Sequence, residues 1–353
     1  LESRYQGSAR RLTMRNPLLA CLPALTCLLA LISCGGAETG PDQLNDYLSR
    51  LSNVVGSPLP APADEAIWLD LPDATITIDA PATKMDLIDF LSLSGCELQV
   101  NLGRRNTQLG RTASPSQRLL LDLEFLELAP DCIERLRYGG DDDLADTLLQ
   151  VSQEREAGLP GSIVKAVLAG PEWQQFWERP ASLGRYPKDT NSQIAATLTQ
   201  LHAMASRWLA GDWAASNRDF ELRLSELRAG DGGALLMAHS QIQRSFLRAT
   251  KLIKQSAEAA TLCPYGRPTD QSRAFERIVS KYFAGGVQPW LVELRQRQEL
   301  LLPPIQALED ALDPSLSRPY DQWRRQRDQL LQTQPQLIRD HVQAIQLALA
   351  DCR

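Results

Sequence analysis

One cysteine, Cys34, stands where a thiol can be joined to a lipid. It ends the stretch Leu31–Cys34, which has the form of a bacterial lipobox: a peptidase would cut before the cysteine, whose sulfur carries the lipid. Arg15 and the apolar run Leu18–Ile32 precede it in the order typical of a secretory signal. That run is shorter than the roughly 20 residues that a membrane-spanning helix needs. We therefore expect cleavage before Cys34 and its acylation, with palmitate among the acyl chains.

The lipobox divides the chain into a leader, a tether and a body. Residues 1–33 are interpreted as a signal peptide with an upstream extension, and residues 34–41 as a lipidated tether. Gly35 follows the cysteine, whereas an Asp at that place retains many Gram-negative lipoproteins in the inner membrane. The expected location is therefore the outer membrane, with the body facing the periplasm.

The cysteine count agrees with an oxidising compartment. Once the leader is removed and Cys34 carries its lipid, four cysteines remain, and an even number indicates two disulfides. Four cysteines allow three pairings, of which we favour Cys96–Cys132 with Cys263–Cys352 because each bond closes a loop within its own half of the chain. A zinc site is not expected, since the sequence has no Cys-x-x-Cys pair.

The body is acidic. Without residues 1–33 it holds 33 basic and 42 acidic residues, a net charge of −9 with neutral histidines. Because nucleic-acid binding depends on neutralising phosphates with Lys and Arg, we expect no nucleic-acid partner. The predicted partners are the membrane, through the lipid anchor, and an envelope protein or a cell-wall component.

A short basic segment is the candidate binding site. Arg104, Arg105, Asn106 and Arg111 together offer the donors that bind an anion such as a glycan carboxylate or a phosphate. The alternative is the C-terminus of a helix, with Gly110 just after the last turn and the arginines near the last carbonyl groups. The pattern favours this second, structural interpretation.

Catalytic, metal-binding and cofactor-binding residues are not predicted. The three histidines lie in helical patterns without a recognisable nucleophile motif, and the sequence has no nucleotide-binding glycine loop. Asp141–Asp143 and Asp146 lack the spacing of a calcium-binding loop and are expected to begin a helix. A carboxylate pair for glycan hydrolysis remains an alternative, because such a pair meets only in the fold.

Helical periodicity dominates the elements that must position these residues. Apolar residues recur at spacings of three and four from Leu44 to Val55 and over most of the chain after Pro81. The segment near residues 60–80 is Pro-rich and then alternating, which indicates extended chain or short strands. The fold class is therefore mainly α, an irregular multi-helix bundle with a short extended or β segment.

Two helical parts are expected within the body. Residues 42–158 would form an N-terminal part and residues 159–353 a C-terminal part, each with one disulfide. Helices are expected over 288–312 and 320–349, among others. The prolines within these two, Pro303-Pro304 and Pro335, should bend or break them.

The stretch Met85–Arg137 resembles a known family. It contains "DFLSLSGCELQ", "RRNTQLGR", "PSQRLLLDLEFL" and "PDCIERL", and a second match extends from Cys263-Pro264 to "VQPWL". These motifs resemble the DUF3080 family, proteobacterial lipoproteins of unknown function. The resemblance implies a lipoprotein and carries no catalytic residue or cofactor. The sequence departs from the family pattern at Arg104, where an acidic residue is usual, and at Thr107, where Ser is usual.

These observations predict an envelope lipoprotein that acts as a non-catalytic binding or scaffolding module facing the periplasm. The alternative is a hydrolase of cell-wall glycan or peptide that uses an unrecognised carboxylate pair.

Overall fold

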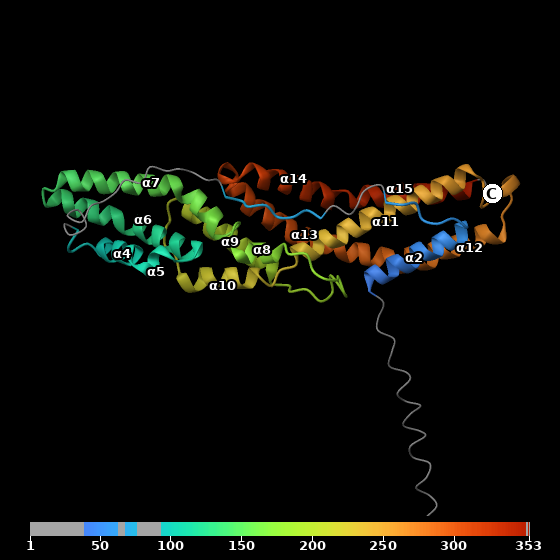
Figure 1. Cartoon of the computed structure of the whole chain (residues 1–353), viewed down its shortest axis with the longest axis horizontal. Coiled ribbons are helices and arrows are strands. Elements are labelled where there is room, and N and C mark those ends of the chain that lie inside the picture. The colour runs from blue at the N-terminus through green and yellow to red at the C-terminus, as the bar shows by residue number, and fades with distance from the viewer. Residues whose placement is uncertain (1–38, 63–67, 76–92, 351, 353) are drawn as a thin grey trace, which may run out of the picture. The chain divides into compact units, whose positions relative to one another are not determined.

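The computed structural model describes residues 39–62, 68–75, 93–350 and 352 of the 353-residue chain. The chain divides into two units, Leu1–Thr39 and Gly40–Arg353, and the described helices belong to the second. Cys34 and the leader expected over residues 1–33 lie outside the described residues. Within the described ranges the second unit is helical with no β-strand, which confirms a mainly α, multi-helix bundle (Figure 1).

The described helices of this unit have the following bounds. They are α2 (Gly40–Val55), α4 (Glu97–Asn106), α5 (Gln108–Arg111), α6 (Pro115–Tyr138), α7 (Asp142–Ala166), α8 (Pro171–Phe176), α9 (Ile194–Leu209), α10 (Asn217–Leu227), α11 (Gly232–Glu258), α12 (Asp270–Ile278), the π-helix η3 (Val279–Val287), α13 (Gln288–Ala311), α14 (Arg318–Gln332) and α15 (Gln334–Ala350), with short 3-10 turns η2 (Pro264–Gly266) and η4 (Asp313–Ser315).

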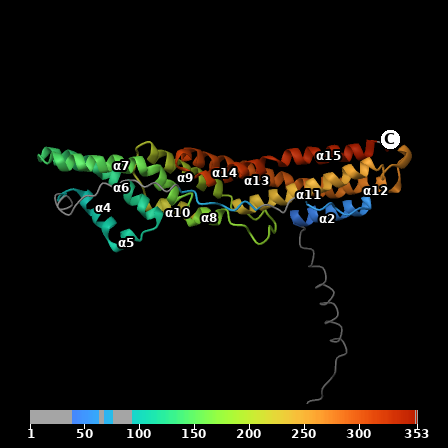
Figure 2. The ribbon, with the colours of Figure 1, turned by 45° about the horizontal axis from the view of Figure 1, so that its top comes forward.

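Two groups of helices lie at opposite ends of the second unit. α6 and α7 form a hairpin that α4 covers, while α11, α15, α2 and α12 gather at the other end (Figure 1). α13 runs beside α9 and contacts η3, so it belongs to the middle as well as to the second group. Figure 2 shows the same grouping from a second direction.

Local signals in the sequence explain where several helices begin. Ser114 caps α6 by accepting a hydrogen bond from the backbone N–H of Gln117, with Pro115 as the first helical residue. Ser317 caps α14 in the same way. Thr269 and Ser272 form a reciprocal capping box at the start of α12. These caps satisfy N–H groups that a helix leaves without partners in its first turn.

Internal prolines do not all end helices. α7 runs without interruption across Pro160, and α13 continues through Pro303-Pro304. A proline removes one hydrogen bond of the helix, and here both helices keep a buried apolar face on either side of it. Pro335 does mark a break: α14 ends at Gln332, and Pro335 is the second residue of α15, where its missing N–H costs no helical bond.

The described part of the segment near residues 60–80 is extended chain that lies on helices. The indole Nε1 of Trp323 in α14 donates to the carbonyl oxygen of Leu69 over 3.0 Å. The backbone N–H of Ser317 donates to the carbonyl oxygen of Ala74 over 3.0 Å. Carbonyl oxygens of residues 68–75 thus accept hydrogen bonds from α14 and its N-cap instead of from a neighbouring strand. Residues 63–67 and 76–80 lie outside the described ranges.

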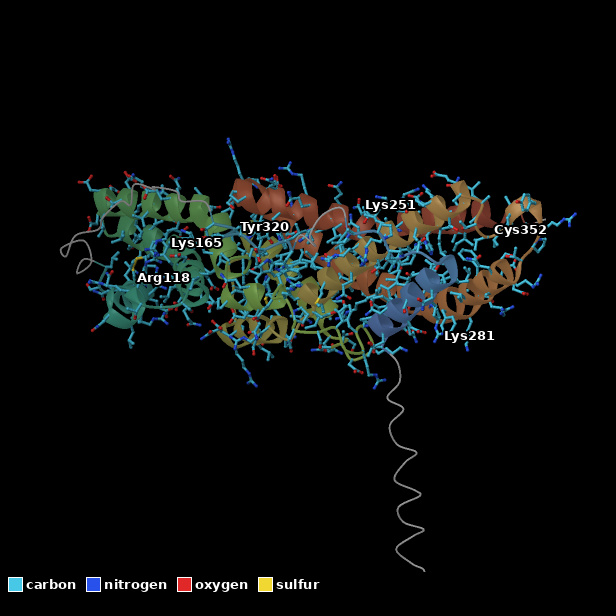
Figure 3. All side chains as sticks on the ribbon, turned by 45° about the vertical axis from the view of Figure 1, so that its right-hand side comes forward. Arg118, Lys165, Lys251, Lys281, Tyr320 and Cys352 are labelled. Carbon is cyan, nitrogen blue, oxygen red and sulfur yellow. A yellow bond between two sulfur atoms is a disulfide. The ribbon has the colours of Figure 1, made fainter. Side chains whose placement is uncertain are left out.

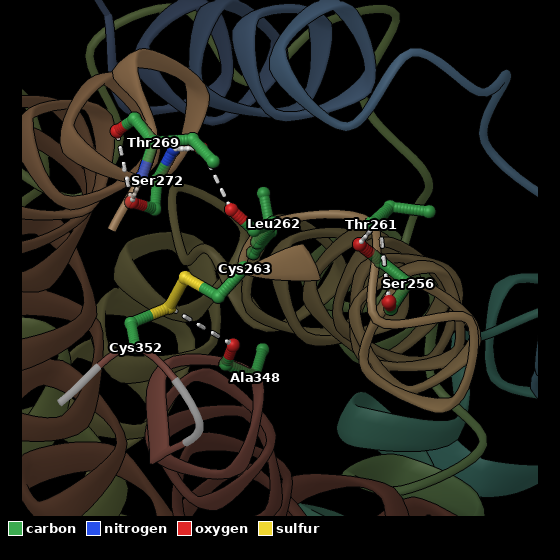
Figure 4. Close-up of a disulfide and its surroundings, with 8 residues drawn as sticks. All are labelled: Ser256, Thr261, Leu262, Cys263, Thr269, Ser272, Ala348 and Cys352. Carbon is green, nitrogen blue, oxygen red and sulfur yellow. Dashed lines mark hydrogen bonds between the residues drawn. A yellow bond between two sulfur atoms is a disulfide. The ribbon is translucent and has the colours of Figure 1, made fainter. Parts of the chain in front are cut away.

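Both disulfides have the favoured pairing. Cys96–Cys132 joins the start of α4 to α6. Cys263–Cys352 joins the segment after α11 to the residues after α15, so the C-terminal ends of these two helices are held together (Figure 4). All four half-cystines are buried, so both disulfides belong to the apolar core.

Candidate functional site

A polar pocket lies where α2 meets α11. It has a volume of about 310 Å³, and we call it the arginine pocket. Three guanidinium groups line it, those of Arg179, Arg244 and Arg248. Its other polar lining residues are Asn45, Ser240, Gln241 and Ser245, and its apolar lining residues are Pro41, Leu44, Leu48, Trp68 and Met237.

One face of α11 supplies half of the lining. Six residues of α11 line the pocket, and each lies three or four positions from at least one other, so they share a face. They are Met237, Ser240, Gln241, Arg244, Ser245 and Arg248. The opposite face of α11 is core. The polar face is therefore held in place by a helix whose other side is fully packed.

The three arginines have different surroundings. Arg248 donates from Nε to the carbonyl oxygen of Pro60 over 2.7 Å, which leaves its terminal nitrogens for other partners. The guanidinium of Arg179 lies 5.4 Å from the ring centroid of Trp68. The Nε of Arg244 is shut off from solvent and has no hydrogen-bond partner within the described part of the chain. A buried donor without a partner is unusual in a folded protein and points to a missing contact.

The charge of the pocket is positive. Among the described residues that line it there is no Asp or Glu to balance the three guanidinium groups. This differs from most other arginines of the chain, which are paired: for example, Arg324 contacts three aspartates. The chemistry that the lining offers is recognition of an anion, since Arg presents several N–H donors in a planar fork.

A buried histidine fixes α2, the first wall of the pocket. His341 of α15 accepts or donates a hydrogen bond at each ring nitrogen: Tyr47 Oη lies 2.7 Å from Nε2, and Thr250 Oγ1 lies 3.1 Å from Nδ1. Phe246 and Phe283 pack edge-on against its ring. The arrangement ties α2 to α11 and α15, and it therefore sets the position of Leu44 and Leu48 relative to Arg244.

Close backbone contact fixes the segment that carries Arg179. A side chain on Gly233 would place its Cβ only 1.8 Å from the carbonyl oxygen of Glu178, and one on Gly232 would meet the ring of Phe176. The first turn of α11 can therefore lie directly on the end of α8 only because these positions are glycine. Arg179 follows at once, so its distance from Arg244 depends on this contact.

A buried ion pair fixes α8, the helix that precedes Arg179, on α13 and α14. Arg327 forms a bidentate pair with Glu309, with Nη–Oε distances of 2.6 and 2.7 Å, and both side chains are fully buried. Tyr320 donates to Glu309 and accepts from the indole of Trp173 in α8. Burial lowers the pKa of Arg327, but the charge of Glu309 outweighs this and raises it above the ordinary value. The pair and Tyr320, which Figure 3 labels, join α13, α14 and α8.

Two arginines of the candidate basic segment form ion pairs with another helix, which agrees with the favoured structural interpretation. Arg104 forms an ion pair with Glu124, and Arg105 with Asp122, both on α6. Asp122 also lies 3.6 Å from Arg155, whose pKa falls to about 10 because of burial and the charge of Arg105. The structure thus uses this charge to hold α4 and α7 on α6.

The neighbouring residues of that segment mark a helix junction. α4 ends at Asn106, and the side chain of Thr107 accepts a hydrogen bond from the backbone N–H of Gly110. Gly110 lies inside the short α5 instead of following a helix end. A Cβ at this position would lie only 2.3 Å from the carbonyl oxygen of Arg104, which favours glycine here. Arg111 is the last residue of α5, and its carbonyl oxygen accepts from Arg118, one of the exposed cations labelled in Figure 3.

Other singled-out residues have structural places. Asp142 and Asp143 lie in the first turn of α7, and Asp146 pairs with Arg137 at 3.3 Å. His239 is buried in α11. Within the described ranges no three His, Cys, Asp or Glu side chains are grouped so as to hold a metal ion. Nor is any described helix long and apolar enough to cross a membrane.

Sequence reasoning missed the arginine pocket, although one signal was present. α11 carries four basic residues and a single acidic one, its last residue Glu258, in a body whose net charge is −9. Two of the four, Arg244 and Arg248, are one turn apart. An excess of positive charge on one helix of an acidic protein is a sequence pattern that can indicate an anion-binding face on that helix.

The fold and the pocket together define, within the described residues, an all-α protein with two disulfides and a pocket lined by three arginines. A family model described as a protein of unknown function, DUF3080, matches residues 44–353, and the chain belongs to that family. No curated protein and no solved structure matches the chain.

Proposed function

We propose that the protein is a non-catalytic binding module of the cell envelope, anchored by a lipid on Cys34 to the outer membrane and facing the periplasm. The observation that carries the binding function is the arginine pocket, whose three guanidinium groups meet no carboxylate among the described lining residues. A site for acid–base hydrolysis of a glycan would need two carboxyl groups facing the substrate. The lining instead offers donors that hold a ligand without changing it.

Crosslinking in intact cells tests this proposal. A photoreactive phenylalanine analogue at Met237, which lines the pocket, should give an adduct with the ligand on irradiation, and mass spectrometry should identify it. Adding Arg244→Gln should reduce the adduct by about fivefold or more, because a charged hydrogen bond to the ligand is lost. The matched control is the same analogue at Leu222, an exposed apolar position on α10 outside the pocket.

The outcome distinguishes binding from catalysis. A fresh sample of the compound identified at Met237 should remain chemically unchanged after incubation with the purified protein. Equal adducts from Met237 and Leu222, or conversion of the captured ligand into a product, would contradict a binding role for this pocket.

A further inference from the structure

The number and arrangement of donors in the arginine pocket define the class of anion that fits it. A carboxylate has two oxygens and is satisfied by a single bidentate guanidinium, whereas a phosphate ester offers two or three free oxygens in three dimensions. Arg179 comes from the segment after α8, and Arg244 and Arg248 from successive turns of α11. Donors that arrive from different elements suit the three-dimensional acceptor better than the planar one.

Hydroxyl and amide groups extend this set. Ser240 and Ser245 flank Arg244 on the pocket side of α11, and each can donate an O–H. Asn45 of α2 lines the pocket from the opposite helix. These hydroxyl and amide groups provide neutral donors beside the charged guanidinium groups.

The volume implies a ligand larger than a free ion. About 310 Å³ is at the lower end of the range of small-molecule sites, which are mostly apolar with a few placed polar groups. Here Leu44, Leu48 and Met237 supply an apolar wall. A phosphate group held by the arginines would therefore carry a small organic part that rests on these side chains.

We propose that the arginine pocket binds the phosphate-ester group of a small organic ligand. This inference rests on the proposed binding function and deepens it by naming the ligand class. Two sources share the chemistry: a soluble phosphate ester and the headgroup of an anionic phospholipid. Pro41 follows Cys34 by seven residues, and seven residues span at most about 25 Å, so a lipid on Cys34 would keep the pocket within reach of headgroups.

Calorimetric titration of the full chain, purified in a non-ionic detergent, tests the proposal. The probes are sn-glycerol 3-phosphate, its carboxylate counterpart glycerate, and mixed micelles of the same detergent containing phosphatidylglycerol. Saturable binding of glycerol phosphate is expected, with glycerate weaker by about tenfold or more, because glycerate cannot use all three guanidinium groups. Micelle binding tighter than that of free glycerol phosphate would support the proposal with a lipid source, and equal binding would support it with a soluble one.

Variants assign the effect to the pocket. Arg244→Gln should weaken glycerol phosphate binding by about tenfold or more, and Arg244→Lys should restore part of it, because Lys keeps the charge but not the planar fork. Arg318→Gln, which removes one charge from an exposed position on α14, should leave binding unchanged. Unchanged thermal unfolding by circular dichroism establishes that each variant is folded.

Two results would overturn the proposal, and they differ in reach. Glycerate binding as tight as glycerol phosphate binding, with the same dependence on Arg244, would remove the phosphate assignment and leave the binding function standing. Titrations of both probes that do not change in Arg244→Gln would remove the phosphate assignment and the binding function together.

Discussion

At the scale of single residues, His341 is a buried imidazole whose polar atoms are all hydrogen-bonded. Both ring nitrogens have hydroxyl partners, and aromatic rings cover the rest of the imidazole. Burial lowers the pKa of His341 to about 4, and burial does the same for His239. Both residues are therefore held neutral in the fold, because a charged imidazole there would lose its hydration.

Acidification should consequently weaken the fold. An unfolded histidine titrates near pH 6.5 whereas these two titrate at about 4, so the unfolded chain takes up protons first as the pH falls. Their contribution is complete above about pH 6.5 and declines towards about pH 4. At about pH 5 the free energy of unfolding should have dropped by roughly 2 kcal/mol for each histidine. Urea unfolding at about pH 7 and about pH 5 measures this difference.

The double variant His239→Gln/His341→Gln provides the control. It lacks both imidazoles, so its loss of stability between the two pH values should be smaller by several kcal/mol than that of the parent chain. An equal loss in the two proteins would assign the pH dependence to other groups.

The residue scale also shows what sequence alone could not reveal. The basic segment at Arg104 and Arg105 left an anion site open as the less favoured interpretation, because the carboxylates that pair with it, Asp122 and Glu124, lie on another helix. Conversely, Arg179 and Arg244 are far apart in sequence, and only the fold brings them to one pocket. Charge along a chain predicts which residues need partners, whereas the fold decides which partners they meet.

At the scale of elements, the contact between α11 and the end of α8 leaves no room for a side chain at Gly233. Gly233 allows the first turn of α11 to rest on the carbonyl of Glu178, and an added methyl group has no room there. Gly161 is the opposite case, because it lies inside α7 with open space around its Cα.

A matched pair of glycine variants should therefore change stability in opposite directions. Gly233→Ala should lower the free energy of unfolding by about 1–3 kcal/mol through overpacking. Gly161→Ala should raise it by about 0.5–1 kcal/mol, because alanine in an open helical position reduces the entropy of the unfolded chain. Chemical unfolding of both variants beside the parent chain measures the two shifts, and a loss of stability in both would contradict the difference in space.

Periodicity predicted the helices well and their interruptions less well. Spacings of three and four marked the core faces of α2 and α6, because burial of one face imposes that pattern on any surface helix. The continuation of α13 through Pro303-Pro304 could not be read in the same way, since tertiary packing outweighs the local cost of proline. Alternation over residues 68–75 also left two outcomes, and contact with α14 selected extended chain over a strand.

At the scale of the whole molecule, the proposal gives two tasks to two parts of the chain: the lipid anchor locates the protein at the membrane, and the helical body binds the ligand. In our proposal the lipid on Cys34 attaches the protein to the membrane, and the described helices supply the pocket. Bacterial lipid anchors hold a protein durably when more than one acyl chain is present, because each buried methylene adds to the binding free energy.

Metabolic labelling with palmitate should locate the anchor. The parent chain and the matched variants Cys21→Ala and Cys27→Ala should incorporate label, whereas Cys34→Ala should lose it. Separated membranes should contain the parent chain in the outer fraction, and Gly35→Asp should move it to the inner one. Labelling that persists in Cys34→Ala would refute the assignment of the lipid to this sulfur.

The two disulfides imply that, under the proposed export route, this chain reaches its full stability only after it has left the cytoplasm. The bonds Cys96–Cys132 and Cys263–Cys352 span 36 and 89 residues, and closing loops of this size contributes roughly 3–5 kcal/mol each through the unfolded state. Neither bond persists in a reducing cytoplasm. Under the proposed export route, the newly made chain would lack this stabilisation until it has crossed the inner membrane. A loosely folded precursor can be threaded through a narrow translocation channel, and oxidation on the far side would then make the passage irreversible.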